Sequence, residues 1–271
     1  MFLNIFIYSM IAGISTILGT LLVFYRYRWA KHNSVHLISF AAGVMLALAF
    51  LHLIPEAVEM GHIEEPTTTI SEESHEGEEG HHHEGNVGVY ILVLGGFVIF
   101  YAIESLVSMH PRHDVDAGCT HESKNLSLMS IIGLTFHSLI DGIIITVGFK
   151  AGFQIGLLTT TAVILHEIPE GIITTGILLH DNMTKKSTFW FSMLVALATP
   201  FGAIVSALIF VDVSKGFLSS LLALASGSLI YIAGSDLIPE THHSEKRFNT
   251  IILIIGMALL YFMGRFLGSG H

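Results

Sequence analysis

The sequence predicts an all-α polytopic membrane protein with eight transmembrane helices. Of its 271 residues, 52% are hydrophobic and 13% are Asp, Glu, Lys or Arg, whereas about 25% of a typical soluble domain is charged. Apolar runs of about 20 residues, the length of a helix that crosses a bilayer, recur along the whole chain. The net charge of −10 excludes a nucleic-acid-binding protein, and the single cysteine excludes an intrachain disulfide.

The apolar runs divide the chain into eight spans, and a single transmembrane domain, 1–271, accounts for all of it. The first span begins Met-Phe-Leu without a basic leader, so we expect it to remain in the protein. Each later span is apolar over the thickness of a bilayer. The predicted spans cover residues 2–25, 34–58, 87–108, 126–149, 153–180, 188–212, 216–239 and 248–268.

The basic residues fall mostly on one side of these spans. Nine of the twelve lie in the segments that follow spans 1, 3, 5 and 7. Basic loops tend to stay cytoplasmic. We therefore expect a multi-pass protein of the cell membrane with both termini outside the cytoplasm.

Residues 59–86 form the one long loop of low complexity, on the outer side in this topology. The loop holds nine glutamates and five histidines and almost no apolar residues, so we expect little fixed structure. It is equally compatible with a solvated acidic linker and with a weak collector of divalent cations. The candidate ligands of such a collector are His81, His82 and His83.

Spans 4 and 5 carry histidines and carboxylates at their centres. Span 4 reads His-Ser-Leu-Ile-Asp-Gly over 137–142, and span 5 reads His-Glu-Ile-Pro-Glu-Gly over 166–171. The first and fifth residues of each segment share a helix face, and the second residue lies about 100° around the helix. Two facing helices would thus converge imidazoles and carboxylates. The candidate ligands are His137, Ser138, Asp141, His166, Glu167 and Glu170.

No cation accompanies these carboxylates, because the predicted spans contain no Lys or Arg apart from Arg265. Ionised groups at membrane depth are costly and usually functional, so bound protons or a metal dication must supply the compensating charge. Nitrogen and oxygen ligands without thiolate suit zinc, and also iron(II), manganese and cadmium. The alternative is a protonated network that only holds two helices together.

The sequence also contains two internal matches. The His-x-x-x-Asp/Glu-Gly segments of spans 4 and 5 align at an offset of 29 residues, and the Leu-Ile-Pro-Glu ends of spans 2 and 7 align at an offset of 184. Each match joins an even span to an odd one, which predicts inverted repeats. The second match contains four candidate pathway or gate residues, although Pro and Glu could simply end and solvate these helices: His52, Glu56, Asp236 and Glu240.

These motifs resemble the ZIP (Zrt-, Irt-like) divalent-metal transporters of the prokaryotic type. The resemblance implies a 3+2+3 arrangement of the helices, a homodimer, and import of zinc, and often of iron, manganese or cadmium, toward the cytoplasm. It also implies that the primary ligands are the four residues that share helix faces, with Ser138 and Glu167 completing a second site. Many members carry Asn where Ser138 stands, and a hydroxyl is a poorer ligand, so we expect one well-occupied metal.

We therefore expect a transporter and not an enzyme, with Zn²⁺ as the transported substrate. A dication that moves inward through a negative-inside potential gains about 4.6 kcal/mol per 100 mV, twice the value for a single charge. No Gly-x-x-x-x-Gly-Lys motif for ATP is present. The alternatives are metal export and an intramembrane zinc hydrolase in which Glu167 or Glu170 activates water.

Overall fold

The described residues of the computed structural model are 1–61, 84–108, 123–209, 214–241 and 246–268. Eight helices or helix series among them are long and apolar enough to cross a membrane, which confirms the predicted class. The helical elements are α1 (Phe2–Tyr25), α2 (Tyr27–His32), α3 (Ser34–Leu48), η1 (Ala49–Leu53), α4 (Ile54–Gly61), α5 (Glu84–Ser108), α6 (Ser123–Ala151), α7 (Phe153–His180), α8 (Lys185–Ile209), α9 (Lys215–Tyr231), η2 (Ile232–Leu237), α10 (Ile238–Thr241) and α11 (Lys246–Gly268).

The observed spans lie close to the predicted ones. The second span continues to Gly61, three residues beyond its predicted end. The third span begins earlier than predicted, because α5 starts at Glu84. Positions 62–83 of this segment, with the three consecutive histidines, lie outside the described residues.

The second and seventh spans each contain a π-helical segment, η1 and η2. Both segments end directly before the sequence Ile-Pro-Glu. Proline has no backbone N–H and crowds the carbonyl four residues earlier, and a π turn accommodates an extra residue at such a point. His52 lies in η1 and Asp236 in η2, so the two candidate gate positions occupy matching irregular turns.

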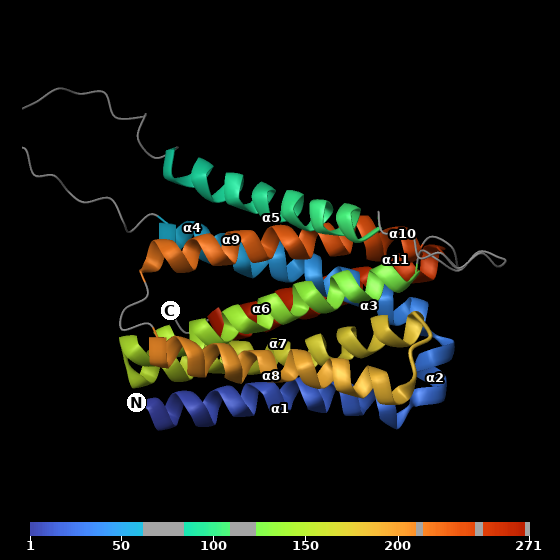
Figure 1. Cartoon of the computed structure of the whole chain (residues 1–271), viewed down its shortest axis with the longest axis horizontal. Helices are drawn as coiled ribbons and strands as arrows, with labels where there is room; N and C mark the ends of the chain where they lie inside the picture. The colour runs from blue at the N-terminus through green and yellow to red at the C-terminus, as the bar shows by residue number, and fades with distance from the viewer. Residues whose placement is uncertain (62–83, 109–122, 210–213, 242–245, 269–271) are drawn as a thin grey trace, which may run out of the picture.

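The eight spans form two four-helix bundles (Figure 1). In the first, here called the α6–α7 bundle, α1, α6, α7 and α8 pack together. In the second, the α3–α9 bundle, α3 with α4, α5, α9 with α10, and α11 pack together. The bundles meet mainly where α3 contacts α7 and where α6 contacts α9 and η2.

Reciprocal glycine contacts hold each bundle together. At four places, a Cβ atom on a glycine of either helix would collide with a backbone carbonyl oxygen of the other helix. Only residues without side chains allow so close an approach. The pairs are Gly19 with Gly171, Gly142 with Gly202, Gly43 with Gly256, and Gly96 with Gly227.

The same four contacts follow the internal repeats, and each lies within one bundle. The contact of α1 with α7 is repeated by the contact of α8 with α6, and the contact of α3 with α11 is repeated by the contact of α9 with α5. This repetition agrees with the predicted inverted repeats. The offsets are 183 residues from Gly19 to Gly202, 29 from Gly142 to Gly171, 184 from Gly43 to Gly227, and 160 from Gly96 to Gly256.

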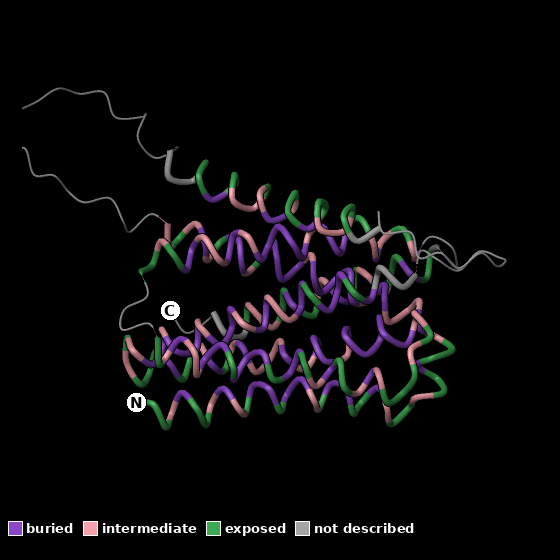
Figure 2. Tube along the Cα trace, viewed as in Figure 1, coloured by how far each residue is buried: buried purple, intermediate pink, exposed green. Residues whose placement is uncertain are grey.

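Buried positions lie along the helix faces that meet inside the molecule, and many exposed positions lie on the outer faces of α1 and α5 (Figure 2). The outer faces carry large apolar side chains, such as Leu18 of α1 and Leu94 of α5. An apolar exterior is what a lipid environment requires.

Candidate metal centre

Two long helices of one bundle position the central cluster. The facing middles of α6 and α7 bring together one ligand atom from each of four residues, all within 4.8 Å of one another: His137, Asp141, His166 and Glu170. The i, i+4 spacing within each helix directs both side chains of a pair toward the other helix. The structure thus brings these four residues together, and their role as metal ligands stays a prediction.

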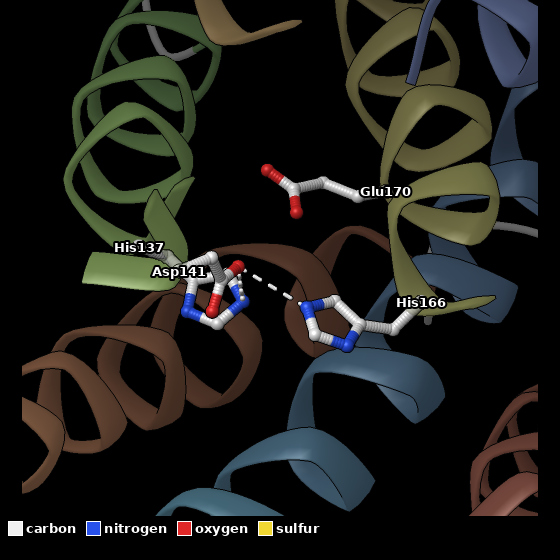
Figure 3. A group of neighbouring side chains, drawn as sticks. All are labelled: His137, Asp141, His166 and Glu170. Atoms are coloured by element: carbon white, nitrogen blue, oxygen red, sulfur yellow. Dashed lines mark hydrogen bonds and ion pairs between the residues drawn. The ribbon is translucent and has the colours of Figure 1, made fainter. Parts of the chain in front are cut away.

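Asp141 lies between the two imidazoles of the cluster (Figure 3). Its Oδ2 atom is 3.2 Å from Nε2 of His137 and 3.1 Å from Nε2 of His166. The two imidazole rings lie with their centroids 5.6 Å apart. Glu170 reaches toward this group from the next turn of α7 (Figure 3). Two nitrogens and two carboxylates thus face a common point.

Some buried side-chain atoms of the cluster residues have no hydrogen-bond partner in the described part of the chain. They include Oε2 of Glu170 and Nδ1 of His137, in residues that are only 3% and 1% exposed. Buried polar atoms are nearly always paired. Helix α7 contains no Lys or Arg, and the two lysines of α6, Lys124 and Lys150, stand at its ends. The donor set therefore fits a small dication with nitrogen and oxygen ligands.

Ser138 and Glu167 lie beside the cluster with their polar atoms engaged by protein groups. The Ser138 hydroxyl donates to Oε1 of Glu170 at 2.6 Å and also lies 2.9 Å from the Leu134 carbonyl oxygen. The Glu167 carboxylate accepts hydrogen bonds from Thr16 of α1 and Thr199 of α8. The role of Ser138 and Glu167 as ligands of a second metal stays a prediction.

A cavity of about 660 Å³ connects the cluster with one end of the molecule. Asp141 and His166 line its deep part, together with His52 and Glu56 from the facing bundle. Toward the end where α4 finishes and α9 begins, the lining includes Glu59 and other residues near those helix ends. The structure thus brings the first pair of candidate gate residues to the same cavity as the cluster.

The second pair, Asp236 and Glu240, lies toward the opposite end. Oε1 of Glu240 is 3.0 Å from Nε2 of His180, the last residue of α7. Nδ1 of His180 is 3.3 Å from the Ser34 hydroxyl at the start of α3. His180 therefore joins the two bundles at this end. Oδ2 of Asp236 is buried and has no hydrogen-bond partner in the described ranges.

Asp181 follows His180 just beyond the end of α7. Its carboxylate accepts a hydrogen bond of 3.0 Å from the backbone N–H of Ser127. Burial is the largest influence on this carboxyl and raises its pKa above the ordinary value, although the hydrogen bonds from Ser127 act in the opposite direction.

The sequence analysis missed three of these residues: Thr16, Thr199 and His180. A signal was present for the threonines, because each stands three residues before a glycine of a reciprocal contact, in Thr-x-x-Gly segments 183 residues apart. No comparable pattern distinguishes His180, which the sequence shows only as a polar residue at the end of a span.

Comparison with known proteins gives one consistent result. A family model described as "ZIP Zinc transporter" matches residues 1–125 and 110–264. "Zinc transporter ZIP4" of Rattus norvegicus is 26% identical over 259 residues, which cover 74% of this chain and 37% of that protein. "Zinc transporter zipt-7.2" of Caenorhabditis elegans is 26% identical over 266 residues, which cover 83% of this chain and 57% of that protein.

A third relative, "Zinc transporter ZIP13" of Pongo abelii, is 27% identical over 220 residues, which cover 79% of this chain and 61% of that protein. The chain thus spans between about a third and three fifths of the length of these relatives.

Proposed function

The chain belongs to the ZIP zinc transporter family, and from this premise we propose that it carries divalent metal ions, zinc foremost, through the central cluster into the cytoplasm. The observation that carries the proposal is the convergence of four buried ligand atoms within 4.8 Å at the middle of two spans. Two imidazoles with two carboxylates suit the tetrahedral coordination of zinc. Iron(II), manganese and cadmium are further candidate substrates, because similar ligands also accept them.

The direction of transport follows from the side on which the cavity lies. If the Lys- and Arg-rich ends face the cytoplasm, the cavity runs from the outer side to Asp141 and His166. His52 and Glu56 would then receive the metal on its way in. Glu240, at the opposite end, would meet it on its way out, together with Asp236. An inside-negative potential favours this direction for a dication.

Alternating access is the mechanism that the two bundles support. The reciprocal glycine contacts hold helices together within each bundle, so each bundle can move as a unit. The metal ligands belong to one bundle, whereas His52 and Glu56 belong to the other. Movement of the α6–α7 bundle against the α3–α9 bundle would therefore open the cluster first to one side of the membrane and then to the other.

His180 supports this mechanism as an inner latch. In a structure whose cavity extends toward the outer end, His180 contacts Glu240 and Ser34 of the other bundle at the inner end. A path to the cytoplasm between α7 and α10 requires these contacts to separate. Separation would also free an imidazole and a carboxylate that could receive the metal.

Because the chain belongs to a transporter family, we do not propose the alternative function of an intramembrane zinc hydrolase. Glu167, one of its candidate bases, has both oxygens occupied by threonine hydroxyls. The proposal also places the protein in the cell membrane, with both termini outside the cytoplasm and as a homodimer in the lipid bilayer. This part rests on the charge distribution and on the family resemblance.

Uptake into proteoliposomes tests the proposed function. Zinc uptake by the full chain should be saturable, should be reduced by cadmium, manganese or iron(II), and should be lost in His137→Ala/Glu170→Ala. Tight zinc binding by the wild type without uptake under any gradient would refute it.

A further inference from the structure

Glu167 is a fully buried carboxyl that adjoins the metal cluster but does not belong to it. It follows His166 on α7 and is 0% exposed, yet the group of converging ligand atoms does not include it. Thr16 Oγ1 donates to Oε2 of Glu167, and Thr199 Oγ1 donates to Oε1 at 2.6 Å. Each carboxylate oxygen of Glu167 thus already accepts a hydrogen bond from a hydroxyl group of a neighbouring helix.

Close backbone contacts fix the positions of the two threonines on their helices. Thr16 precedes Gly19 by one helical turn, and its carbonyl oxygen is the atom that a Cβ on Gly171 of α7 would meet. Thr199 precedes Gly202 in the same way, and its carbonyl oxygen would meet a Cβ on Gly142 of α6. The backbone of neither threonine can move away without separating helices that touch along their backbones.

A second ion beside the first would have to compete with these hydrogen bonds for the orientation of the side chains. Such an ion would need oxygens from Ser138, Glu167 and Glu170. Glu167 would have to turn toward the ion from the position in which both threonine hydroxyls hold it, and Ser138 would have to turn from the position in which it donates to Oε1 of Glu170. Hydrogen bonds to carboxylates are the stronger class. The unpartnered Oε2 of Glu170 is the oxygen that stays available to the first ion.

We propose that Thr16 and Thr199 are positioning residues that hold Glu167 out of the coordination sphere and limit the transport site to one four-coordinate ion. The proposal rests on the proposed function. Four ligands with two imidazoles favour zinc, whereas manganese prefers six ligands rich in oxygen. The two threonines therefore act on selectivity: a released Glu167 adds an oxygen ligand and makes the site more favourable to manganese.

Cobalt(II) provides the direct test, because four-coordinate tetrahedral cobalt absorbs visible light far more strongly than five- or six-coordinate cobalt. The full chain carries His81→Ala, His82→Ala and His83→Ala in every sample, so that cobalt bound by this part of the acidic segment contributes less to the spectrum. The wild-type site should give a tetrahedral spectrum with one ion, and Glu167→Gln should leave both unchanged. Loss of a bound ion or an altered spectrum in Glu167→Gln would overturn the proposal.

The threonines are tested in the same assay. Thr16→Val/Thr199→Val should weaken the tetrahedral bands and improve competition by manganese against zinc about tenfold, the scale of effects of residues that support a metal site. Thr199→Ser in the Thr16→Val background should restore most of the spectrum because it returns one hydroxyl. Thr160→Val is the matched control: Thr160 is equally buried, and among the described residues its hydroxyl bonds only the Gly156 carbonyl of its own helix.

Two results separate this proposal from the proposed function. An unchanged spectrum and an unchanged manganese competition in the double valine variant would refute the positioning role while the four-ligand site stands. An unchanged spectrum in Glu170→Gln would instead refute the site itself, and the positioning role with it. If the double valine variant fails to fold, Glu167→Gln alone decides.

Discussion

Replacement of His180 by alanine should shift the protein away from the state in which its cavity extends toward the outer end. The imidazole makes two contacts across the bundle interface, at 3.0 Å to Glu240 and 3.3 Å to Ser34. Each is worth about 0.5–1.5 kcal/mol net, and the contact to Glu240 belongs at the low end because that side chain is 38% exposed. The loss is therefore about 1–2 kcal/mol, or about a fivefold to thirtyfold change in the equilibrium between the two states.

The labelling of a cysteine in the cavity measures this shift. Ala162 lines the cavity one helical turn before His166, so Ala162→Cys in a Cys119→Ser background should react with a membrane-impermeant thiol reagent added outside. If the inner end is closed in ten molecules of eleven, a tenfold shift of the equilibrium between the two states lowers the labelling rate to about half.

The matched control is His36→Ala. His36 is also near the inner end, but its Nδ1 atom pairs at 2.8 Å with Asn249 of its own bundle, so its loss should leave labelling unchanged. Equal labelling rates in His180→Ala and His36→Ala would refute the latch.

Three further predictions concern packing, pH and the acidic segment. Gly142→Ala should destabilise the folded protein by about 1–3 kcal/mol, because the added Cβ would collide with the Thr199 carbonyl oxygen. Thermal unfolding in detergent measures this loss of stability. Gly88→Ala should show no loss of stability, because a Cβ at Gly88 has no neighbour within 4 Å. The raised pKa of Asp181 means that folding favours the protonated carboxyl, so the contribution of this group to stability is lost as pH rises through the folded pKa. Asp181→Asn should therefore raise the melting temperature at about pH 8 but not at about pH 4, near the pKa of a free aspartate. An equal effect at both pH values would contradict the reasoning. Replacing His81, His82 and His83 together by alanine should raise the zinc concentration for half-maximal uptake without changing the maximal rate, if the segment collects cations, and unaltered uptake would favour a solvated linker.

The pairing of His137 with Asp141 and of His166 with Glu170 on one face of each helix was predictable because it depends on local geometry. An i, i+4 pair shares a face in any helix, and the lack of Lys and Arg in the predicted spans, apart from Arg265, left a metal or protons as the balancing charge. The Pro-Glu sequences of the second and seventh spans were interpreted as gate positions or helix ends, whereas the structure places a π-helical turn directly before each Ile-Pro-Glu sequence.

The environment of Glu167 was not predictable in the same way. Its two partners lie 151 and 32 residues away on other helices, and the position of those helices depends on the glycine contacts. The contact between His180 and Glu240 likewise depends on how the two bundles meet. Sequence periodicity describes one helix at a time, so contacts of this kind require the three-dimensional arrangement.

The central claim is that every transported ion passes through the cluster, and electrogenic zinc flux tests it most directly. Proteoliposomes with a potassium gradient and valinomycin set a negative interior, and a trapped zinc indicator reports entry. Asp141 is the decisive position, because its Oδ2 atom lies 3.2 Å and 3.1 Å from the two imidazoles. The account predicts saturable entry that increases with the potential in the wild type and is abolished in Asp141→Asn. Wild-type flux in correctly folded Asp141→Asn would contradict it.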